Sequence, residues 1–233
     1  MVPAVLGHCV NRLRYRAVAP LYRVIWIQPS AVKHKVGSGA HRGWAVGTIA
    51  AGDWDLDVHP YSDSPKYRGL VERFEEGREW RDTTLFRVTF PERLVRDGEV
   101  LGLRSLRELE DHYRTRIDPL FHELKARGFA PPSLRKRVDA VYAFIGRGGE
   151  IIWGPGGNHR LSLAKILDLE RIPVRIHARH AEWQKVRERM SRLGEDSVPD
   201  DLKGHPDLDG LGPGAGQLPT RPSWPRSVPG RSR

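Results

Sequence analysis

The residues best suited to chemistry in this sequence form a short polar segment, Gly157-Asn158-His159-Arg160, at the end of a glycine-rich turn. We refer to these four residues as the phosphate box. The glycines let the backbone approach a ligand closely, and a helix expected to begin near Asn158 directs its unbonded amides and its dipole at an anion. His159 adds hydrogen-bond donors, and the guanidinium of Arg160 can hold a phosphate through two oxygens. The segment therefore predicts a phosphate-binding site.

A second interpretation of the same segment is purely structural. Glycine-rich turns between a strand and a helix occur in many folds, and Arg160 can pair with a local carboxylate instead of a ligand. Asn158 also has two roles open to it. It can donate to a phosphate oxygen, or it can cap the helix, a position that asparagine favours. The residues alone leave these alternatives open.

An acidic loop from Gly52 to His59 is the second candidate site. Asp53, Asp55 and Asp57 alternate along it, so their carboxylates project on one side if the segment is extended. Such carboxylates can bind Mg²⁺, and one of them can act as a base toward an attacked hydroxyl. We therefore assign Asp53 and Asp55 as candidate metal ligands and catalytic residues. The alternative is a solvated acidic loop that holds one arginine.

The elements expected around the phosphate box are two short strands, a helix and a third strand. Residues 138–145 are almost continuously apolar, which is typical of a strand covered on both faces, and a glycine turn leads into a second strand at 150–153. Beyond the box, a helix buries an apolar stripe that begins at Leu161, and a strand follows at 173–177. We expect the last strand, helix and strand to form a βαβ unit.

Further elements are expected on both sides of this segment. The patterns predict strands at 22–27 and 85–90, and helices at 65–76, 105–128 and 183–193. Ser105 and Glu108 have the spacing of a capping box at the start of the middle helix. The mixture of helices and strands predicts an α/β (α+β) fold, with helices packed on a small mixed sheet.

Residues 138–180, which contain the Gly-Asn-His-Arg box and the Arg-Ile-Pro-Val-Arg-Ile strand after it, resemble the core of the ParB/sulfiredoxin superfamily. The segment Ile-Gln-Pro-Ser-Ala-Val at 27–32 is similar to the opening strand of that family, and 105–128 is similar to the helical segment before its hairpin. The resemblance implies a domain over 21–195 in which the box holds nucleotide phosphates. Residues 36–104 would then be an inserted subdomain.

The box differs between branches of this superfamily. Sulfiredoxins carry a catalytic cysteine where this chain has Asn158, and the single cysteine, Cys9, is far from the box in sequence, so we expect no sulfiredoxin activity. ParB partition proteins bind CTP phosphates and carry a helix-turn-helix domain after the box, for which we expect no room after Trp183. Free-serine kinases of the superfamily use a His-Arg box on a nucleotide.

Charge indicates the kind of partner. The net charge is +10, and residues from 196 onward carry five acidic and five basic side chains, so the excess lies on the preceding part of the chain. A basic domain attracts nucleotides and, weakly and without sequence preference, nucleic acids. The alternative cause of the many arginines is a GC-rich genome.

Composition indicates the setting of the domain. No apolar stretch approaches the roughly 18 residues of a membrane helix, so we expect no membrane partner, and the single cysteine fits a cytoplasmic protein. Residues 1–20 are expected to form a loose basic arm. Residues 196–233 are rich in glycine and proline, and we expect a disordered tail there.

Two hypotheses of function follow. In the first, the protein is a nucleotide-dependent phosphotransferase or NTP hydrolase, which uses a nucleoside triphosphate and Mg²⁺ on a small polar substrate. In the second, it is a non-catalytic module that senses nucleotides or binds nucleic acid. Fold resemblance does not decide between them because the superfamily contains both. The carboxylates of Asp53 and Asp55 favour the first.

Overall fold

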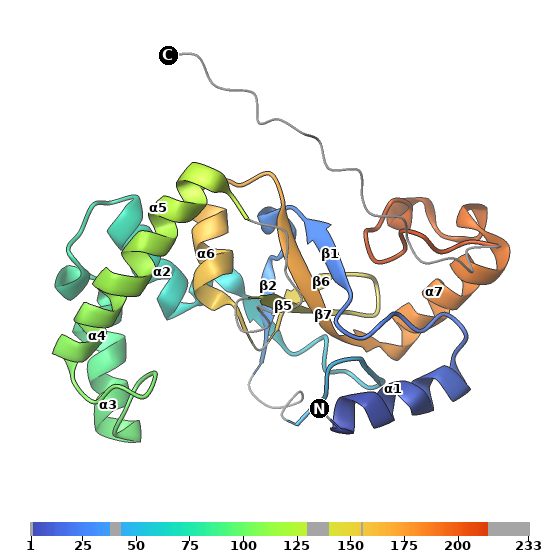
Figure 1. Ribbon diagram of the computed structural model, residues 1–233, viewed down its shortest axis with the longest axis horizontal. Coiled ribbons are helices and arrows are strands. Elements are labelled where there is room, and N and C mark those ends of the chain that lie inside the picture. The colour runs from blue at the N-terminus through green and yellow to red at the C-terminus, as the bar shows by residue number, and fades with distance from the viewer. Residues whose placement is uncertain (1, 38–42, 130–139, 155, 214–233) are drawn as a thin grey trace, which may run out of the picture.

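A mixed seven-stranded sheet forms the centre of the computed structural model, which describes residues 2–37, 43–129, 140–154 and 156–213 (Figure 1). The strands are β1 (Val24–Ile27), β2 (His34–Val36), β3 (Thr48–Ala50), β4 (Val58–Pro60), β5 (Val141–Ile145), β6 (Ile151–Trp153) and β7 (Ile172–His180). Their order is β1-β7-β5-β6-β2-β4, and β3 pairs with β7. Helices pack on this sheet, so the predicted α/β class is confirmed.

The longest strand, β7, organises the sheet. Its first half pairs antiparallel with β1 and its second half pairs parallel with β3, so β1 and β3 share one edge of it. On the other edge β5 runs parallel to β7, and β5 turns back antiparallel into β6. The prediction that β6, the helix after it and β7 form a βαβ unit is wrong. The parallel neighbour of β7 is β5, and β6 lies one strand further out.

The principal core lies on the face of the sheet that α6 (Asn158–Ile166) and α7 (Ala181–Leu193) cover. Alternate residues of β7, such as Val174, point into this core and meet Leu161 from α6 and Trp183 from α7, and all three are fully buried. On the opposite face, Trp54 packs edge-on against Phe144, with ring centroids 5.8 Å apart. Both faces of the central strands are therefore covered, which explains their continuous apolar runs.

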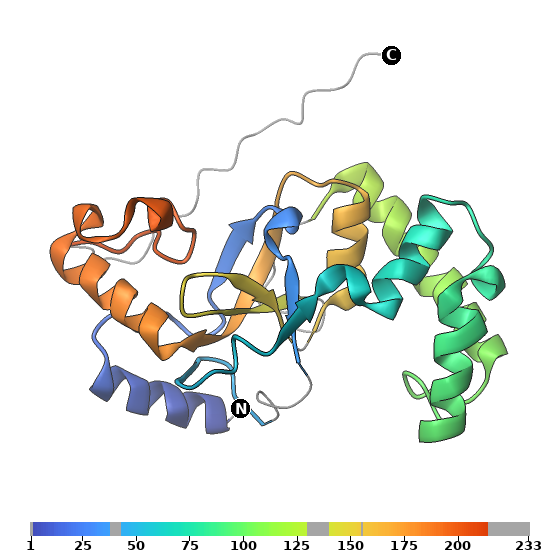
Figure 2. The same cartoon turned by 180° about the vertical axis from the view of Figure 1, so that it is seen from behind.

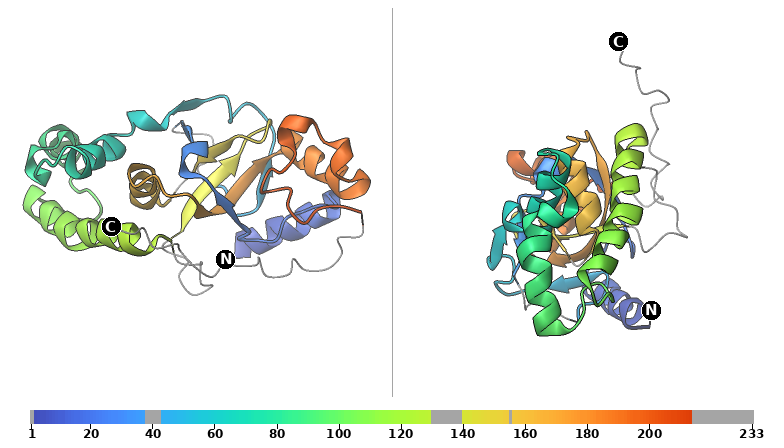
Figure 3. Two further views of the ribbon diagram at one scale, coloured as in Figure 1. Left: turned by 90° about the horizontal axis from the view of Figure 1, so that it is seen from above. Right: turned by 90° about the vertical axis from the view of Figure 1, so that its left-hand side faces the viewer.

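A layer of helices lies beside the sheet, as Figure 3 shows from above. It consists of α2 (Pro65–Phe74), α3 (Phe90–Asp97), α4 (Leu106–His112) and α5 (Asp118–Arg127), which enclose a core of their own. The chain enters this layer directly from β4 (Figure 2). Residues 36–104, expected as one inserted subdomain, thus divide between the sheet, to which they add β3 and β4, and the helical layer.

The predicted capping box is confirmed at the start of α4. The hydroxyl of Ser105 accepts from the amide of Glu108 at 3.2 Å, and the carboxylate of Glu108 accepts from the amide of Ser105 at 3.2 Å. Because each side chain satisfies an amide of the other residue, the helix begins at a defined position.

Two π-helical turns lie in the helical layer, at Leu85–Thr89 and Tyr113–Ile117. The strand predicted at 85–90 is wrong, because Leu85, Phe86 and Phe90 all turn toward the core of the helical layer. Short 3₁₀ turns lie at Pro29–Ala31, Tyr61–Asp63, Trp80–Asp82, Glu195–Ser197 and Asp200–Leu202.

The N-terminal residues do not form the expected loose arm. They contain α1 (Val2–Arg14), which docks on the domain through Asn11, whose Nδ2 donates to the carbonyl of Gly47 at 2.9 Å. No helix among the described residues combines the length and the apolar character needed to cross a membrane.

Part of the segment expected to be a disordered tail, 196–233, packs on the domain, so the predicted boundary at 195 is wrong. Val198 and Leu208 are buried in the principal core, and Asp207 is fully buried. Residues 214–233 of the expected tail lie outside the described residues.

Asp207 anchors this C-terminal segment in a cluster of arginines. Its carboxylate accepts from Arg179 Nε at 2.8 Å and Nη2 at 2.5 Å, from Arg187 Nη1 at 2.9 Å and from Trp183 Nε1 at 3.0 Å. Burial by itself would raise the pKa of Asp207, but the charges and hydrogen bonds of the two arginines outweigh it and hold the pKa well below its usual range. The segment is therefore attached by a buried ionic contact as well as by apolar packing.

Candidate phosphate-binding site

The phosphate box lies where β6 ends and α6 begins, and the turn before it is fixed against the start of β5. The amide of Gly154 donates to the carbonyl of Tyr142 at 2.9 Å, and the amide of Tyr142 donates to the carbonyl of Gly156 at 3.2 Å. Trp153 supports the same turn, because its Nε1 donates to the carbonyl of Gly156 at 3.1 Å. The start of α6 is thus held in a defined place on the sheet.

Gly157 occupies a position that only a glycine fits. Its φ is +78°, and an added Cβ would lie 2.5 Å from Cα of Val141 and 2.7 Å from the carbonyl oxygen of Ala140. These are backbone atoms of another segment, so they cannot move aside without displacing the box from β5. At this position the lack of a side chain lets the backbone of the box pack closely against the start of β5, and not against a ligand.

Asn158 is the first residue of α6, and Gly157 is the N-cap, so the interpretation of Asn158 as the helix cap is wrong. The side-chain Oδ1 of Asn158 accepts from the hydroxyl of Ser162 at 3.2 Å, and that hydroxyl lies 2.9 Å from the hydroxyl of Tyr61. With Oδ1 engaged, the group that Asn158 offers to a ligand is its Nδ2 amide, a donor.

His159 connects the box to the helical layer, because its Nε2 lies 2.9 Å from the hydroxyl of Tyr113. Burial lowers the pKa of His159 to about 3, and the charges of Lys66 and His112 act in the same direction. Burial also raises the pKa of Tyr113, so both groups are neutral at neutral pH. His159 thus supplies a positioned hydrogen-bonding ring rather than a positive charge.

The low pKa of His159 predicts that acidification destabilises the fold. An unfolded histidine binds its proton near pH 6.5, whereas folded His159 binds one only near pH 3, so between these values the unfolded state holds more protons. Stability should therefore fall as the pH drops, with a loss of up to about 2 kcal/mol between about pH 7 and about pH 5. Urea unfolding at both pH values measures this loss. The loss should be smaller in His159→Gln. An equal loss in both proteins would contradict the lowered pKa of His159 as its cause.

The box lines a cavity of about 1060 Å³ between the sheet and the helical layer. Basic side chains from three further elements join it there: Lys35 from β2, Lys66 from the first turn of α2, and Arg116 from the second π-helical turn. The other lining residues are Ser64, Leu101, His112, Thr115, Ile117, Pro119, Leu120, Glu123, Trp153 and Gly156. The strand register places Lys35 beside Trp153, the last residue of β6 and four positions before the first residue of the box.

The cavity wall is basic. Lys35, Lys66, Arg116 and Arg160 line it, and Glu123 is the one acidic side chain among the lining residues that the structure describes. Burial, and to a smaller extent the charge of Arg93, lowers the pKa of Lys66. The first turns of both α2 and α6 also border the cavity, so the positive ends of two helix dipoles lie at its wall. This arrangement attracts anions.

The sequence predicts the box but not Lys35, Lys66 and Arg116, which are distant from it along the chain. One local signal was available for Lys66. It lies in the first turn of the helix predicted at 65–76, and a cation is unfavourable next to the positive end of a helix dipole. A lysine at such a position is consistent with a ligand that offsets the repulsion.

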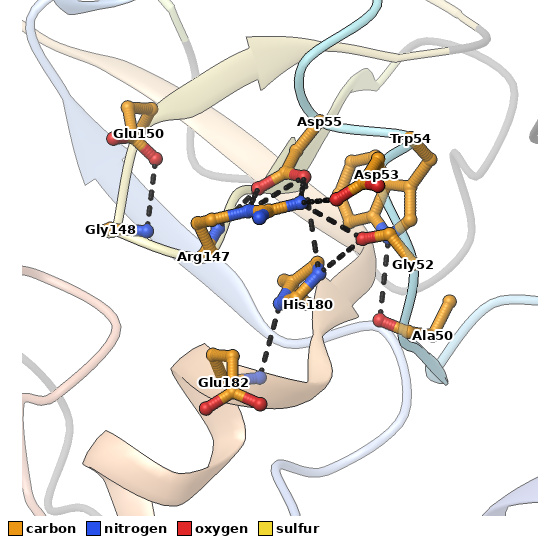
Figure 4. Close-up of polar contacts among 10 residues, drawn as sticks. All are labelled: Ala50, Gly52, Asp53, Trp54, Asp55, Arg147, Gly148, Glu150, His180 and Glu182. Atoms are coloured by element: carbon orange, nitrogen blue, oxygen red, sulfur yellow. Dashed lines mark hydrogen bonds and ion pairs between the residues drawn. The ribbon is translucent and has the colours of Figure 1, made fainter.

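The predicted acidic loop forms an ion-pair cluster instead of an open carboxylate site (Figure 4). Asp55 is buried and accepts from Arg147 Nε at 2.9 Å, from Arg147 Nη2 at 2.7 Å and from the Arg147 amide at 2.7 Å. Asp53 accepts from Nη2 of the same arginine at 2.8 Å. Burial by itself would raise the pKa of Asp55, but the hydrogen bonds from Arg147 outweigh it, and the pKa is lowered.

The acidic loop and the phosphate box lie at opposite ends of the β5–β6 hairpin. Arg147 belongs to the turn before β6, whereas the box follows the other end of β6. The structure therefore does not bring Asp53 and Asp55 to the box. Both oxygens of Asp55 already accept from a guanidinium, a poor fit to Mg²⁺, and no three His, Cys, Asp or Glu side chains within the described ranges are grouped to hold a metal ion. The structure agrees with the alternative interpretation, an acidic loop that holds one arginine, which is Arg147.

Two matched substitutions test the structural role of the loop. Asp55→Asn should lower the free energy of unfolding by about 1–3 kcal/mol, because the Arg147 contacts lose their ionised acceptor. Asp53→Asn should change it by less than about 0.5 kcal/mol, because the carboxylate of Asp53 is 79% exposed and that of Asp55 is 2% exposed. Melting curves measure both, and neither variant should change nucleotide affinity. Mg²⁺-dependent nucleotide turnover that is lost in both variants would instead support the catalytic hypothesis.

No protein-family model, curated protein or solved structure matches this chain.

Proposed function

We propose that this protein binds a nucleotide in the cavity between the sheet and the helical layer, with the phosphates at the phosphate box. The observation that carries the proposal is that the box, Lys35, Lys66 and Arg116 gather around one cavity, to which the described residues contribute a single carboxylate, from Glu123. A cluster of this charge is costly to assemble unless a counter-anion is bound.

The wall offers different chemistry to the two ends of a nucleotide. A phosphate at the start of α6 would meet backbone amides, the Nδ2 of Asn158 and the guanidinium of Arg160. Leu101, Ile117, Pro119, Leu120 and Trp153 supply apolar surface to the same cavity, which suits a base. The volume is also sufficient, because pockets for ligands of this size span roughly 300–1,000 Å³.

The geometry favours binding without catalysis over the phosphotransferase or hydrolase hypothesis. Phosphoryl transfer needs carboxylates to hold Mg²⁺ and a group that positions the nucleophile. Asp53 and Asp55 are engaged by Arg147 at the far end of the β5–β6 hairpin, and within the described part of the chain Glu123 is the carboxylate at the cavity wall. We therefore place the sensing or binding hypothesis first.

We also propose that the chain is a divergent member of the ParB/sulfiredoxin superfamily. The support is the resemblance of the box together with the order of elements around it, a hairpin of β5 and β6, then α6, then β7. Membership would make a nucleotide the expected ligand of the box.

Thermal unfolding in the presence of nucleotides tests the proposal. A nucleotide at 100 times its dissociation constant should add about 2.7 kcal/mol to the stability of the folded state. Nucleoside triphosphates should raise the melting temperature with or without Mg²⁺, whereas the corresponding nucleosides, which lack phosphate, should not. Equal shifts with nucleosides, or no shift with any nucleotide, would contradict phosphate binding at this site.

A further inference from the structure

Helix α1 turns an apolar face away from the domain. Leu13 is 91% exposed and Leu6 is 65% exposed, while Val5 and Val10 are about half exposed. The spacing of these four residues, together with the exposed Cys9, places them on one side of the helix. Lone exposed apolar residues are common on protein surfaces, but a stripe along a whole helix indicates an interaction surface.

The orientation of this face is fixed by contacts on the other side of the helix. Ala4 is buried, and Asn11 bonds to the carbonyl of Gly47 at 2.9 Å. Just beyond the helix, the amide of Arg16 donates to the carboxylate of Glu188 on α7 at 3.1 Å. The side of α1 opposite the apolar stripe contacts the domain, so the stripe is left facing outward.

The charges on α1 select the partner. The helix contains no acidic residue, and Arg12 and Arg14 lie in its last turn, followed by the exposed Arg16. An apolar stripe bordered by arginines is the pattern of a helix that lies in the surface of a membrane, with its apolar face at the acyl boundary and its cations at the phosphates.

We propose that α1 binds the surface of an anionic lipid bilayer, lying in the plane of the interface. The expectation of no membrane partner came from the lack of an apolar stretch long enough to span a bilayer, and a helix that lies in the interface needs no such stretch. Pairing of two copies through α1 is less well supported. Each copy carries a net charge of +10, and two helices of 13 residues bury little compared with the roughly 1,200 Å² of a specific interface.

This surface is independent of the proposed nucleotide site. In Figures 1 and 3, α1 and α7 lie beyond one end of the sheet, and the helical layer that walls the cavity lies beyond the other end. Membrane binding would leave the cavity accessible, and a bound nucleotide should not change the affinity for membranes. Failure of one proposal therefore does not imply failure of the other.

Co-sedimentation of the full chain with lipid vesicles tests the proposal. Vesicles of phosphatidylcholine with about 30% phosphatidylglycerol should sediment the protein, and pure phosphatidylcholine should sediment much less. Leu6→Glu and Leu13→Glu should each lower the bound fraction by about 10-fold, because a carboxylate would enter the acyl boundary. The matched control is Val95→Glu on α3, where the side chain is 88% exposed, and binding should be unchanged. These side chains are exposed, so folding should persist in all three variants.

Cys9, the single cysteine of the chain, gives an independent readout. It is exposed on the apolar stripe, so an environment-sensitive fluorophore attached there should shift to shorter wavelength with anionic vesicles. Equal sedimentation of Leu6→Glu, Leu13→Glu and the unsubstituted protein would overturn the proposal. So would the absence of binding to anionic vesicles, or a dimer in solution that Leu13→Glu dissociates without any vesicle binding.

Discussion

Replacing Asp207 with alanine should lower the free energy of unfolding by about 3–5 kcal/mol, the cost of removing one partner from a buried ion pair. Arg179 and Arg187 would then keep buried positive charges with no carboxylate, since their side chains are 5% and 1% exposed. Burial, only partly offset by Asp207, already lowers the pKa of Arg187 to about 10. For a domain of this size the loss corresponds to a melting temperature lower by roughly 6–20 °C.

Thermal denaturation of three variants separates the ionic contact from its surroundings. Asp207→Asn keeps the shape but removes the charge, so it should fall between the unsubstituted protein and Asp207→Ala. Asp209→Ala is the matched control on the same segment, because its side chain is exposed and Arg23 donates to its backbone carbonyl, which the substitution retains. Truncation after Gly204 should cost at least as much as Asp207→Ala. A truncated chain with unchanged melting temperature would show that the segment from 205 onward does not anchor the fold.

Replacing Arg160 with alanine should weaken nucleotide binding by roughly 10- to 100-fold, since charge-assisted hydrogen bonds are worth about 1.5–3 kcal/mol each. The side chain lines the cavity and is partly exposed, and the fully buried stripe of α6 begins one residue later, at Leu161. Stability should therefore change little. Arg160→Lys should recover only part of the affinity, because an ammonium keeps the charge but lacks the two-pronged geometry.

The elements that the sequence predicts well are those with a local physical signal. The capping box of Ser105 and Glu108 lies within one helical turn, and the helix at the box begins directly after a glycine that its backbone geometry requires. The apolar run of β5 likewise reports burial on both faces. In each case the residues that determine the structure are neighbours in the chain.

Other elements depend on contacts that no local pattern reveals. The run from Leu85 to Phe90 is rich in apolar and β-branched residues, and only the neighbouring helices show that it is a π-helical turn. The segment near Asp207 has few large apolar side chains, and its ionic anchor is a carboxylate whose arginine partners lie 20 and 28 positions earlier. Helix α1 was missed because it is stabilised by docking and not by a recognisable cap.

The two candidate sites illustrate the same distinction. The box is one contiguous segment, so the sequence could identify it, whereas the basic wall opposite comes from elements that only the fold brings together. In the acidic loop, Asp53 and Asp55 lie together because both accept from one guanidinium. Their partner, Arg147, is 92 positions from Asp55, so the ion pair that occupies them could not be inferred from the loop itself.

Calorimetric titration of a nucleoside triphosphate into three proteins tests the central claim most directly: the unsubstituted chain, Arg160→Ala, and Arg192→Ala, an exposed arginine of α7 away from the cavity. Melting curves of the same samples establish that each is folded. We predict one site on the unsubstituted chain, unchanged affinity in Arg192→Ala, and the roughly 10- to 100-fold loss in Arg160→Ala at nearly unchanged stability. Equal affinity in all three proteins would contradict the claim. So would an Arg160→Ala variant that is strongly destabilised while its folded fraction binds normally, because Arg160 would then be a structural residue.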